Sequence, residues 1–339
     1  MDHHKHAGAF VAAAFTIISG AGNFAWAQGL GKSIDKVRVG TPSPASIAVL
    51  QIKIAELKGF FRDEGIQAEI IQMRVPVSMV ALVTKDIDYA TPTGTLLVSA
   101  VKSLPLRVAM YFLRAPLHVL NAKPEIRATA ELRGKTVGIG GIGEATEPML
   151  KAMLRTVKLD SEKDIKVLQF SGSGSRFAAL TAGLMDAAVL PPPYNLRAEA
   201  QGYRRLTSVA AAPEVLDGTI ALAPPTGLGV NLEKPQNNPT QVKKMIRAIL
   251  KSHNFIRSQK VETTKIISEW LKLDPSMAAG AYDMFVGAMA ADGMVKETAV
   301  AAAVDQVLQE LKLNQPIANS SVIDFAVLKE ALTELGGMK

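Results

Sequence analysis

Two aspartates stand at the same position of a repeated phrase, and their spacing makes them a candidate pair for acid–base chemistry. ALVTKDIDYA at 81–90 returns as ALTAGLMDAA at 179–188, which places Asp88 and Asp186 98 residues apart. Two carboxylates in one site can divide the roles of general acid and general base. Each aspartate, however, directly precedes a short apolar run that ends at prolines. We therefore favour a role at a turn or at the start of a strand.

Other side chains that commonly catalyse reactions are scarce. The chain has no cysteine, which excludes a thiolate nucleophile, a disulfide framework and thiolate metal sites. Three of the five histidines fall within the first six residues, which leaves His118 and His253. GSG at 172–174 lacks the G-x-S-x-G frame of a nucleophilic serine. No catalytic set, metal site or cofactor is predicted, and the residues favour a binding protein over an enzyme.

A glycine-rich segment, GIGGIG at 138–143, matches the dinucleotide fingerprint G-x-G-x-x-G. It follows a predicted strand and opens a predicted helix. The fingerprint also needs an acidic residue at the end of the next strand, but that strand ends in LQFS at 168–171. A nicotinamide or flavin site is therefore disfavoured. What remains is a helix start whose N–H groups can bind a polar or anionic ligand.

Strands and helices alternate over the first 230 residues, which predicts an α/β fold with largely parallel sheets. Strands are predicted at 36–41, 67–73, 106–113, 117–122, 136–139 and 165–170, and helices at 45–58, 78–85 and 146–157. After Pro239 the pattern is almost wholly helical. Small and hydroxyl residues follow several predicted strands: Ser43, the segment 91–95, and Ser173 with Ser175. Each can be an ordinary helix cap, but together they favour a binding cleft.

The repeated phrase predicts one helix-to-strand unit in each of two similar lobes. Its alternative is chance similarity between two short alanine-rich stretches. A length of 339 residues suits two domains. Two facing lobes form a cleft, and α/β sheets bind ligands at the carboxyl ends of their strands.

The first 27 residues have the pattern of a cleaved export signal. An apolar run follows Lys5, and AWA at 25–27 precedes Gln28 as a cleavage site. A membrane anchor is the weaker alternative, because spanning a bilayer takes about 20 strongly apolar residues. We therefore expect a periplasmic protein. The formal charge is +7, but Lys and Arg are scattered, so nucleic acid is not expected as a partner.

Three phrases resemble one family. LKGFFRDEGI at 57–66 resembles the end of the family's first helix, L-x-G-K is matched at 132–135, and A-L-x-x-G-x-x-D at 179–186. The family is the exported solute-binding proteins of ABC importers in the nitrate, sulfonate and taurine group, which includes thiamine-pyrimidine precursor proteins. The resemblance implies the two-lobed type II periplasmic-binding-protein fold, in which each lobe is a mixed, mostly parallel sheet flanked by helices, with an interlobe cleft and a helical C-terminal region. Lobe I would comprise 34–113 and 225–339, and lobe II 114–224.

The resemblance also implies ligand-binding positions and partners. The ligand would be a small polar organic solute, and a monomer would deliver it to an ABC permease and its ATPase. With the strand-end residues, the expected binding residues are Ser43, Pro44, Ala45, Thr93, Gly94, Thr95, Arg114, Gly143, Glu144, Ala145, Thr146, Ser173 and Tyr194.

Glu144 departs from the family, whose sulfonate binders usually have a small hydroxyl residue or glycine there. If Glu144 faces the cleft, it repels nitrate or sulfonate and favours a neutral, zwitterionic or amine-bearing solute. If it does not, it caps the helix. Tyr194 is expected to stack on the solute, and Arg114 to pair with a carboxylate.

Two alternatives remain open at this point. One is an enzyme on the same fold, of the pyrimidine-synthesising kind. The other is a sensor module that presents its ligand to a receptor instead of a permease.

Overall fold

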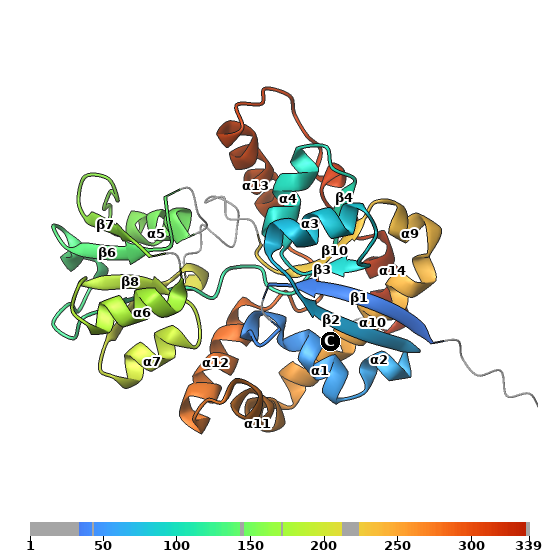
Figure 1. The fold of residues 1–339 in the computed structure, drawn as a ribbon, viewed down its shortest axis with the longest axis horizontal. Helices are drawn as coiled ribbons and strands as arrows, with labels where there is room; N and C mark the ends of the chain where they lie inside the picture. The colour runs from blue at the N-terminus through green and yellow to red at the C-terminus, as the bar shows by residue number, and fades with distance from the viewer. Residues whose placement is uncertain (1–33, 43, 143–145, 171, 212–223, 337–339) are drawn as a thin grey trace, which may run out of the picture. The chain divides into compact units, whose positions relative to one another are not determined.

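The computed structural model describes residues 34–42, 44–142, 146–170, 172–211 and 224–336. Its first sheet has the strand order β2-β1-β3-β10-β4 (Figure 1). The strands are β1 (Asp35–Thr41), β2 (Ile66–Gln72), β3 (Tyr89–Ala90), β4 (Leu106–Tyr111) and β10 (Gly227–Asn231). β1 pairs in parallel with β2 and β3, and β10 pairs antiparallel with β3 and β4. Four strands thus run one way, and β10 runs against them.

The second sheet repeats this arrangement in the order β7-β6-β8-β5-β9. Its strands are β5 (Val119–Ala122), β6 (Thr136–Ile139), β7 (Lys166–Gln169), β8 (Ala187–Leu190) and β9 (Arg204–Ser208). β6 pairs in parallel with β7 and β8, whereas β5 pairs antiparallel with β8 and β9. The predicted mixed, mostly parallel sheets are confirmed. The antiparallel strand precedes the rest of its sheet in the second case and follows it in the first.

The repeated phrase is one structural unit in both sheets. It joins α3 (Val75–Val83) to β3 and α6 (Ser173–Thr181) to β8. The turn residue has a positive φ in both copies, 66° at Lys85 and 77° at Gly183. Leu82 and Leu180 are fully buried. The structure therefore confirms the predicted repeat.

Register and close packing follow the same spacing of 98 residues. Val39 pairs with Tyr89 in the first sheet, and Val137 with Ala187 in the second. The next residue in each strand is a glycine, Gly40 or Gly138. A Cβ at Gly40 would come within 3 Å of the Ile87 side chain, and a Cβ at Gly138 within 3 Å of the Met185 side chain, so neither position has room for a larger residue. The structural repeat therefore extends beyond the ten-residue phrase and includes the strands that pair with it.

Asp88 and Asp186 have the structural role that the sequence favours. The Asp88 carboxylate accepts a hydrogen bond of 2.8 Å from the N–H of Arg38, and the Asp186 carboxylate one of 2.9 Å from Thr136. Each aspartate also forms an ion pair, Asp88 with Lys234 and Asp186 with Lys123. Burial raises the pKa of Asp186, but the N–H of Thr136 and the ammonium of Lys123 outweigh it and lower that pKa. Both carboxylates therefore fix the start of a central strand.

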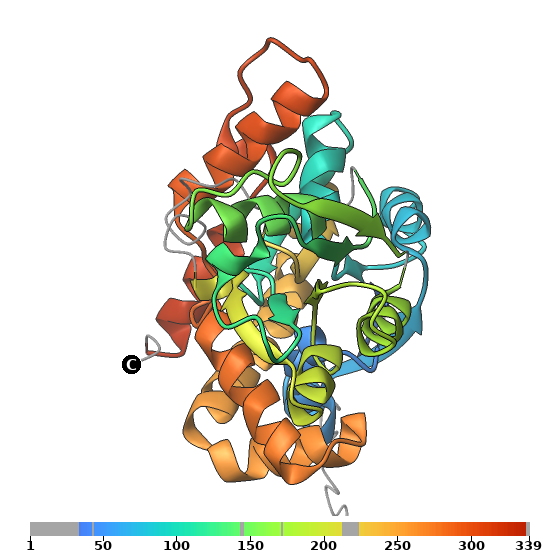
Figure 2. The ribbon, with the colours of Figure 1, turned by 90° about the vertical axis from the view of Figure 1, so that its left-hand side faces the viewer.

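Helices cover both faces of each sheet (Figures 1 and 2). One face of the first sheet packs against α1, α10, α12 and α14, and the other against α3, α4 and α13. The second sheet packs against α5 on one face and against α6 and α7 on the other. The remaining helices are α1 (Leu50–Leu57), α2 (Phe60–Asp63), α4 (Thr93–Val101), α5 (Thr146–Arg155), α7 (Tyr194–Ala200), α9 (Glu233–Asn237), α10 (Pro239–Ser258), α11 (Lys260–Leu271), α12 (Pro275–Ala288), α13 (Glu297–Glu310) and α14 (Ala326–Glu334).

The C-terminal region is helical, as expected. α10 begins where the Asn238 side chain accepts a hydrogen bond from the N–H of Gln241, and proline takes its first position. Several boundaries differ from the sequence prediction. The helix expected from Ser78 begins at Val75, because Pro76 suits a first turn, and the strand expected to reach Leu113 ends at Tyr111. No helix in the described part of the chain has the length and apolar character to span a bilayer.

Candidate functional site

Most of the described candidate residues lie at helix starts that follow the carboxyl ends of strands. Thr93, Gly94 and Thr95 form the first turn of α4, and Pro44 and Ala45 lie in the turn after β1. Thr146, Ser173 and Tyr194 are the first residues of α5, α6 and α7. Free N–H groups at such helix starts are donors for polar or anionic ligands. Ser43, Gly143, Glu144 and Ala145 lie outside the described residues, so both alternatives for the orientation of Glu144 stay open.

Three threonines at the first sheet's edge bond within the protein. Thr91 donates to the Thr41 hydroxyl at 3.0 Å, and Thr93 donates to the Pro224 carbonyl at 2.9 Å; all three threonines are fully buried. Thr95 is exposed, and Gly94 is partly exposed. The Thr93 hydroxyl therefore holds the end of the strand in place, while Gly94 and Thr95 are accessible to solvent.

Thr146 performs a similar task at the second sheet's edge. Its buried hydroxyl accepts a hydrogen bond of 2.8 Å from the N–H of Gly140. The N–H of Ile142 is held by the Gln169 side chain at 3.2 Å. The glycine-rich segment is thereby tied to α5 and to the end of β7. Neither of these contacts to the glycine-rich segment comes from an acidic residue of the kind that a dinucleotide site needs.

Arg176 is a buried cation that the sequence reasoning missed. Only 3% of its surface is exposed. It donates to the carbonyls of Val189 and Phe170 at 3.0 and 3.1 Å, and to the Ser173 hydroxyl at 3.1 Å. The guanidinium therefore lies at the carboxyl ends of β7 and β8, beside a predicted binding residue. Its counterpart 98 residues earlier is Ser78, whose hydroxyl bonds only to its own helix.

Tyr194 and Arg114 lie in different surroundings. The Tyr194 ring packs at 5.9 Å from the Phe177 ring, and the Arg197 guanidinium lies 5.9 Å from its centre. Arg114 is exposed on the link between the sheets and donates to the Gly287 carbonyl at 2.8 Å. The structure thus places Arg114 against the end of α12.

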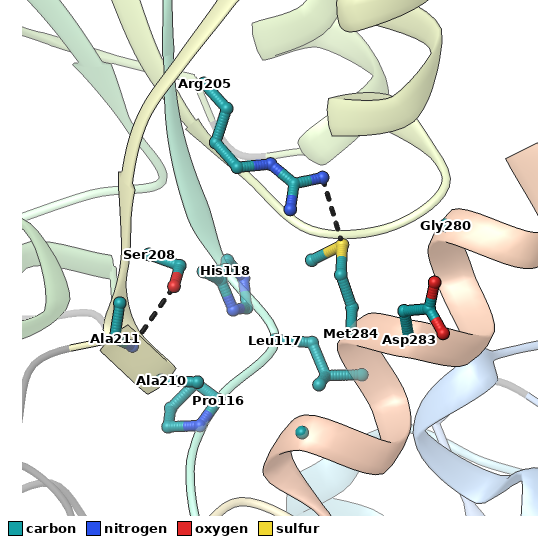
Figure 3. A pocket seen from close by; sticks show the side chains of 11 residues that line it. Pro116, Leu117, His118, Arg205, Ser208, Ala210, Ala211, Gly280, Asp283 and Met284 are labelled. Carbon is teal, nitrogen blue, oxygen red and sulfur yellow. Dashed lines mark hydrogen bonds between the residues drawn. The ribbon is translucent and has the colours of Figure 1, made fainter.

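A pocket of about 400 Å³ lies beside the link between the sheets (Figure 3). None of the predicted binding residues that the structure describes lines it. Its walls are formed by Pro116, Leu117, His118, Arg205, Ser208, Ala210, Ala211, Gly280, Asp283, Met284 and Gly287. Burial, aided by the charge of Arg176, lowers the pKa of His118 to about 4, so this imidazole is neutral near pH 7.

The described residues hold no cluster of three or more His, Cys, Asp or Glu that is suited to a metal ion. His253 is enclosed in the core against Ala291, and burial lowers its pKa to about 4. Asp88 and Asp186 are occupied at strand starts, so they do not form an acid–base pair in one site.

Solved structures share this fold. A putative periplasmic sulfonate-binding protein, SsuA from Methylobacillus flagellatus KT, matches with a TM-score of 0.70 at 16% identity, over 90% of this chain and 96% of its own. The periplasmic nitrate-binding protein NrtA from Synechocystis PCC 6803 matches with a TM-score of 0.62 at 14% identity, over 89% of each chain. The desulfurization enzyme DSZB matches with a TM-score of 0.66 at 16% identity, over 89% of this chain and 99% of its own. At such low identity these likenesses establish the fold alone.

Among proteins with curated descriptions, none matches the sequence. The family model described as NMT1/THI5 like matches residues 47–262, which is more than half of the chain. That segment contains the second sheet, β10 and most of the first sheet, arranged as in the solved type II periplasmic binding proteins. The chain therefore belongs to the NMT1/THI5-like family.

Proposed function

We propose that the protein is an exported solute-binding protein that captures a small organic solute and delivers it to an ABC-type importer. The solute would bind between lobe I, 34–113 with 225–339, and lobe II, 114–224. After removal of residues 1–27, the protein would act in the periplasm and have no chemistry of its own.

The observation that carries this proposal is the shared geometry of the candidate residues. In both sheets, helices α4, α5, α6 and α7 are the next helices after a strand's carboxyl end, with candidate residues in the first turn. Arg176 adds a positive charge at the second sheet's edge, beside Ser173. Helix N-termini favour a ligand with a carboxylate or another anionic group. If Glu144 faces the cleft, a zwitterionic solute would meet these N-termini and the Glu144 carboxylate together.

Thermal unfolding of the chain from Gln28 onward, against nitrate, sulfonates, carboxylates, amino acids and pyrimidines, tests the proposal. A ligand at 100 times its Kd adds about 2.7 kcal/mol to the free energy of unfolding. Tyr194→Ala should abolish the shift. Tyr203→Ala is the matched control, because both tyrosines pack against the same cluster but only Tyr194 begins a helix at a strand end. A solute that stabilises both variants equally would contradict the predicted site.

The enzyme alternative has the fold of DSZB in its favour. Against it, the chain contains no cysteine, and Asp88 and Asp186 each bond at a strand start and do not form an acid–base pair in one site. Conversion of a panel solute by the purified protein would overturn the solute-binding proposal. Stimulated uptake of the bound solute by a reconstituted permease and ATPase would distinguish an importer component from a sensor module.

A further inference from the structure

The pocket in Figure 3 lies at the carboxyl edge of the second sheet, where the candidate helices follow the strands. β5 pairs antiparallel with both β8 and β9, so β8 and β9 run in the same direction. His118, directly before β5, and Ser208, at the end of β9, therefore lie at the same edge as the end of β8, which α7 follows. Both residues line the pocket, together with Pro116 and Leu117 of the link between the sheets. The pocket is thus the part of this edge that lies next to the link.

Another wall of the pocket is α12, which belongs to the proposed lobe I. α12 packs in the core of the first sheet and contacts the short 3-10 helix Ile47–Val49, which comes after β1. On the other side, the amide of Asn195 in α7 donates a hydrogen bond of 3.2 Å to the Met284 sulfur of α12. Asn195 directly follows Tyr194, one of the predicted binding residues. The pocket therefore lies between the two proposed lobes, beside the helix that begins at Tyr194.

The wall around Met284 is held by contacts within the protein. The Glu199 carboxylate accepts two hydrogen bonds of 2.9 Å from Arg205 and one of 3.3 Å from the amide of Asn195. Both donors also reach the Met284 sulfur, Asn195 at 3.2 Å and Arg205 at 3.5 Å. Figure 3 shows the contact between Arg205 and Met284. One carboxylate thus positions the groups that fix Met284, and small-molecule sites usually have such preformed walls.

The lining of the pocket is mainly apolar. Pro116, Leu117, Ala210, Ala211 and Met284 all contribute to it. The volume of about 400 Å³ falls in the range of small-molecule sites, which are lined predominantly by hydrophobic side chains. The pocket is therefore large enough for an alkyl chain or a ring, and its surface suits one.

The two charged side chains of the lining already face opposite charges. The Arg205 guanidinium is paired with Glu199, and the Asp283 carboxylate lies 2.7 Å from the ammonium of Lys260. A charged group in the pocket would have to compete with one of these pairs or approach a like charge. The pocket therefore favours an uncharged group.

We propose that this pocket receives an uncharged, apolar end of the solute, and that Leu117, Ala210 and Met284 select solutes with such an end. The polar group of the solute binds at the helix starts of the same interlobe site. The inference rests on the proposed function, because it extends that site. The solute is then an amphipathic organic molecule, whereas nitrate or a wholly polar solute gains nothing from the pocket.

Two series of straight-chain probes test the inference, carboxylates from acetate to octanoate and α-amino acids from alanine to 2-aminooctanoate. In a series whose polar group binds, affinity should rise about 3- to 4-fold for each CH2 group that enters the pocket, until the pocket is full. Methyl NMR of the protein with labelled methionines locates the chain, because Met284 lines the pocket and Met284→Leu assigns its signal. We expect a saturable shift of the Met284 signal with the longer members.

A variant that fills the pocket links the chain-length dependence to this place. Gly287 lines the pocket, and a Cβ added there meets no heavy atom within 4 Å. Gly287→Leu should therefore fold normally, weaken the longest probe that binds by about 10-fold or more, and leave the shortest within about 2-fold. Ser276→Leu is the matched control, because it adds the same side chain to an exposed position of the same helix outside the pocket.

The outcomes separate the inference from the proposed function. A solute that stabilises the protein and depends on Tyr194, but neither gains from chain length nor shifts the Met284 signal, would overturn the inference and leave the proposed function standing. The same chain-length dependence in Gly287→Leu as in the unaltered protein would also overturn it. If no probe and no other small solute binds, the proposed function fails, and the inference falls with it.

Discussion

The first sheet and the second hold the start of their central strands in the same way. In each, the aspartate of the repeated phrase accepts a hydrogen bond from a strand N–H and pairs with a lysine that follows the antiparallel strand. At the carboxyl ends they differ: Ser78 in one is Arg176 in the other. The shared residues therefore secure one end of the strands, while the divergent residues lie at the end where ligands of such sheets bind.

The largest expected effect comes from the buried leucines of the phrase. Leu82→Ala and Leu180→Ala should each lower the free energy of unfolding by about 2–5 kcal/mol, because both side chains are fully buried. Denaturant unfolding measures the loss. Leu184→Ala, at a position 64% exposed, should change it by less than about 0.5 kcal/mol. A loss of stability at only one of the two buried positions would show that the two copies of the phrase contribute unequally to stability.

The two enclosed histidines give the next effect, and each belongs to a different sheet. His118 precedes β5, beside Arg176, and His253 lies in α10, near Asp292 and Arg257. Burial lowers both pKa values to about 4, whereas an unfolded histidine has a pKa of about 6.5. As pH falls below 6.5 only the unfolded state gains these protons. Stability is therefore full above pH 6.5 and falls by about 1.4 kcal/mol per pH unit for each histidine down to about pH 4.

Urea unfolding at pH 7.5, 6 and 5 checks this dependence. His118→Gln and His253→Gln should each remove the contribution of one histidine to the dependence of the free energy of unfolding on pH. If the sheets unfold together, the two contributions add in one transition. If they unfold separately, each variant flattens a different transition, which would show that the two sheets unfold independently. A slope that neither variant changes would refute the assignment.

The smallest effect lies in the turn of the phrase. Gly183→Ala should cost about 1 kcal/mol, because φ is 77° and nothing else opposes a Cβ there. Lys85→Gly should instead raise stability by roughly 0.5 kcal/mol, since relief of the strained φ outweighs the greater freedom of the unfolded chain. Lys85→Asn is the control, because it loses the exposed pair with Glu233 but tolerates a positive φ. Thermal unfolding of the three variants measures these changes, and equal signs for Gly183→Ala and Lys85→Gly would break the equivalence of the turns.

The sequence predicts local features and those that repeat. Asp88 and Asp186 were recognisable because they share a position in one phrase, and the α/β alternation follows from apolar periodicity within short windows. Arg176 was missed because an arginine within a helical segment usually lies in solvent, and its burial depends on carbonyls supplied by two different strands. The pocket was missed because residues more than 150 positions apart line it. Contacts of that kind leave no periodic pattern.

The place of β10 in the chain governs the order in which the sheets are completed during synthesis. Strands β5 to β9 are consecutive, so every strand of their sheet exists once residue 208 has been made. β3 and β4 instead flank β10, which ends at Asn231, and the core beneath them needs α10, α12 and α14 as well. Because a ribosome adds about 5–20 residues per second, these early strands wait for partners that emerge seconds later. The part of the protein that is made first is therefore the last to be finished.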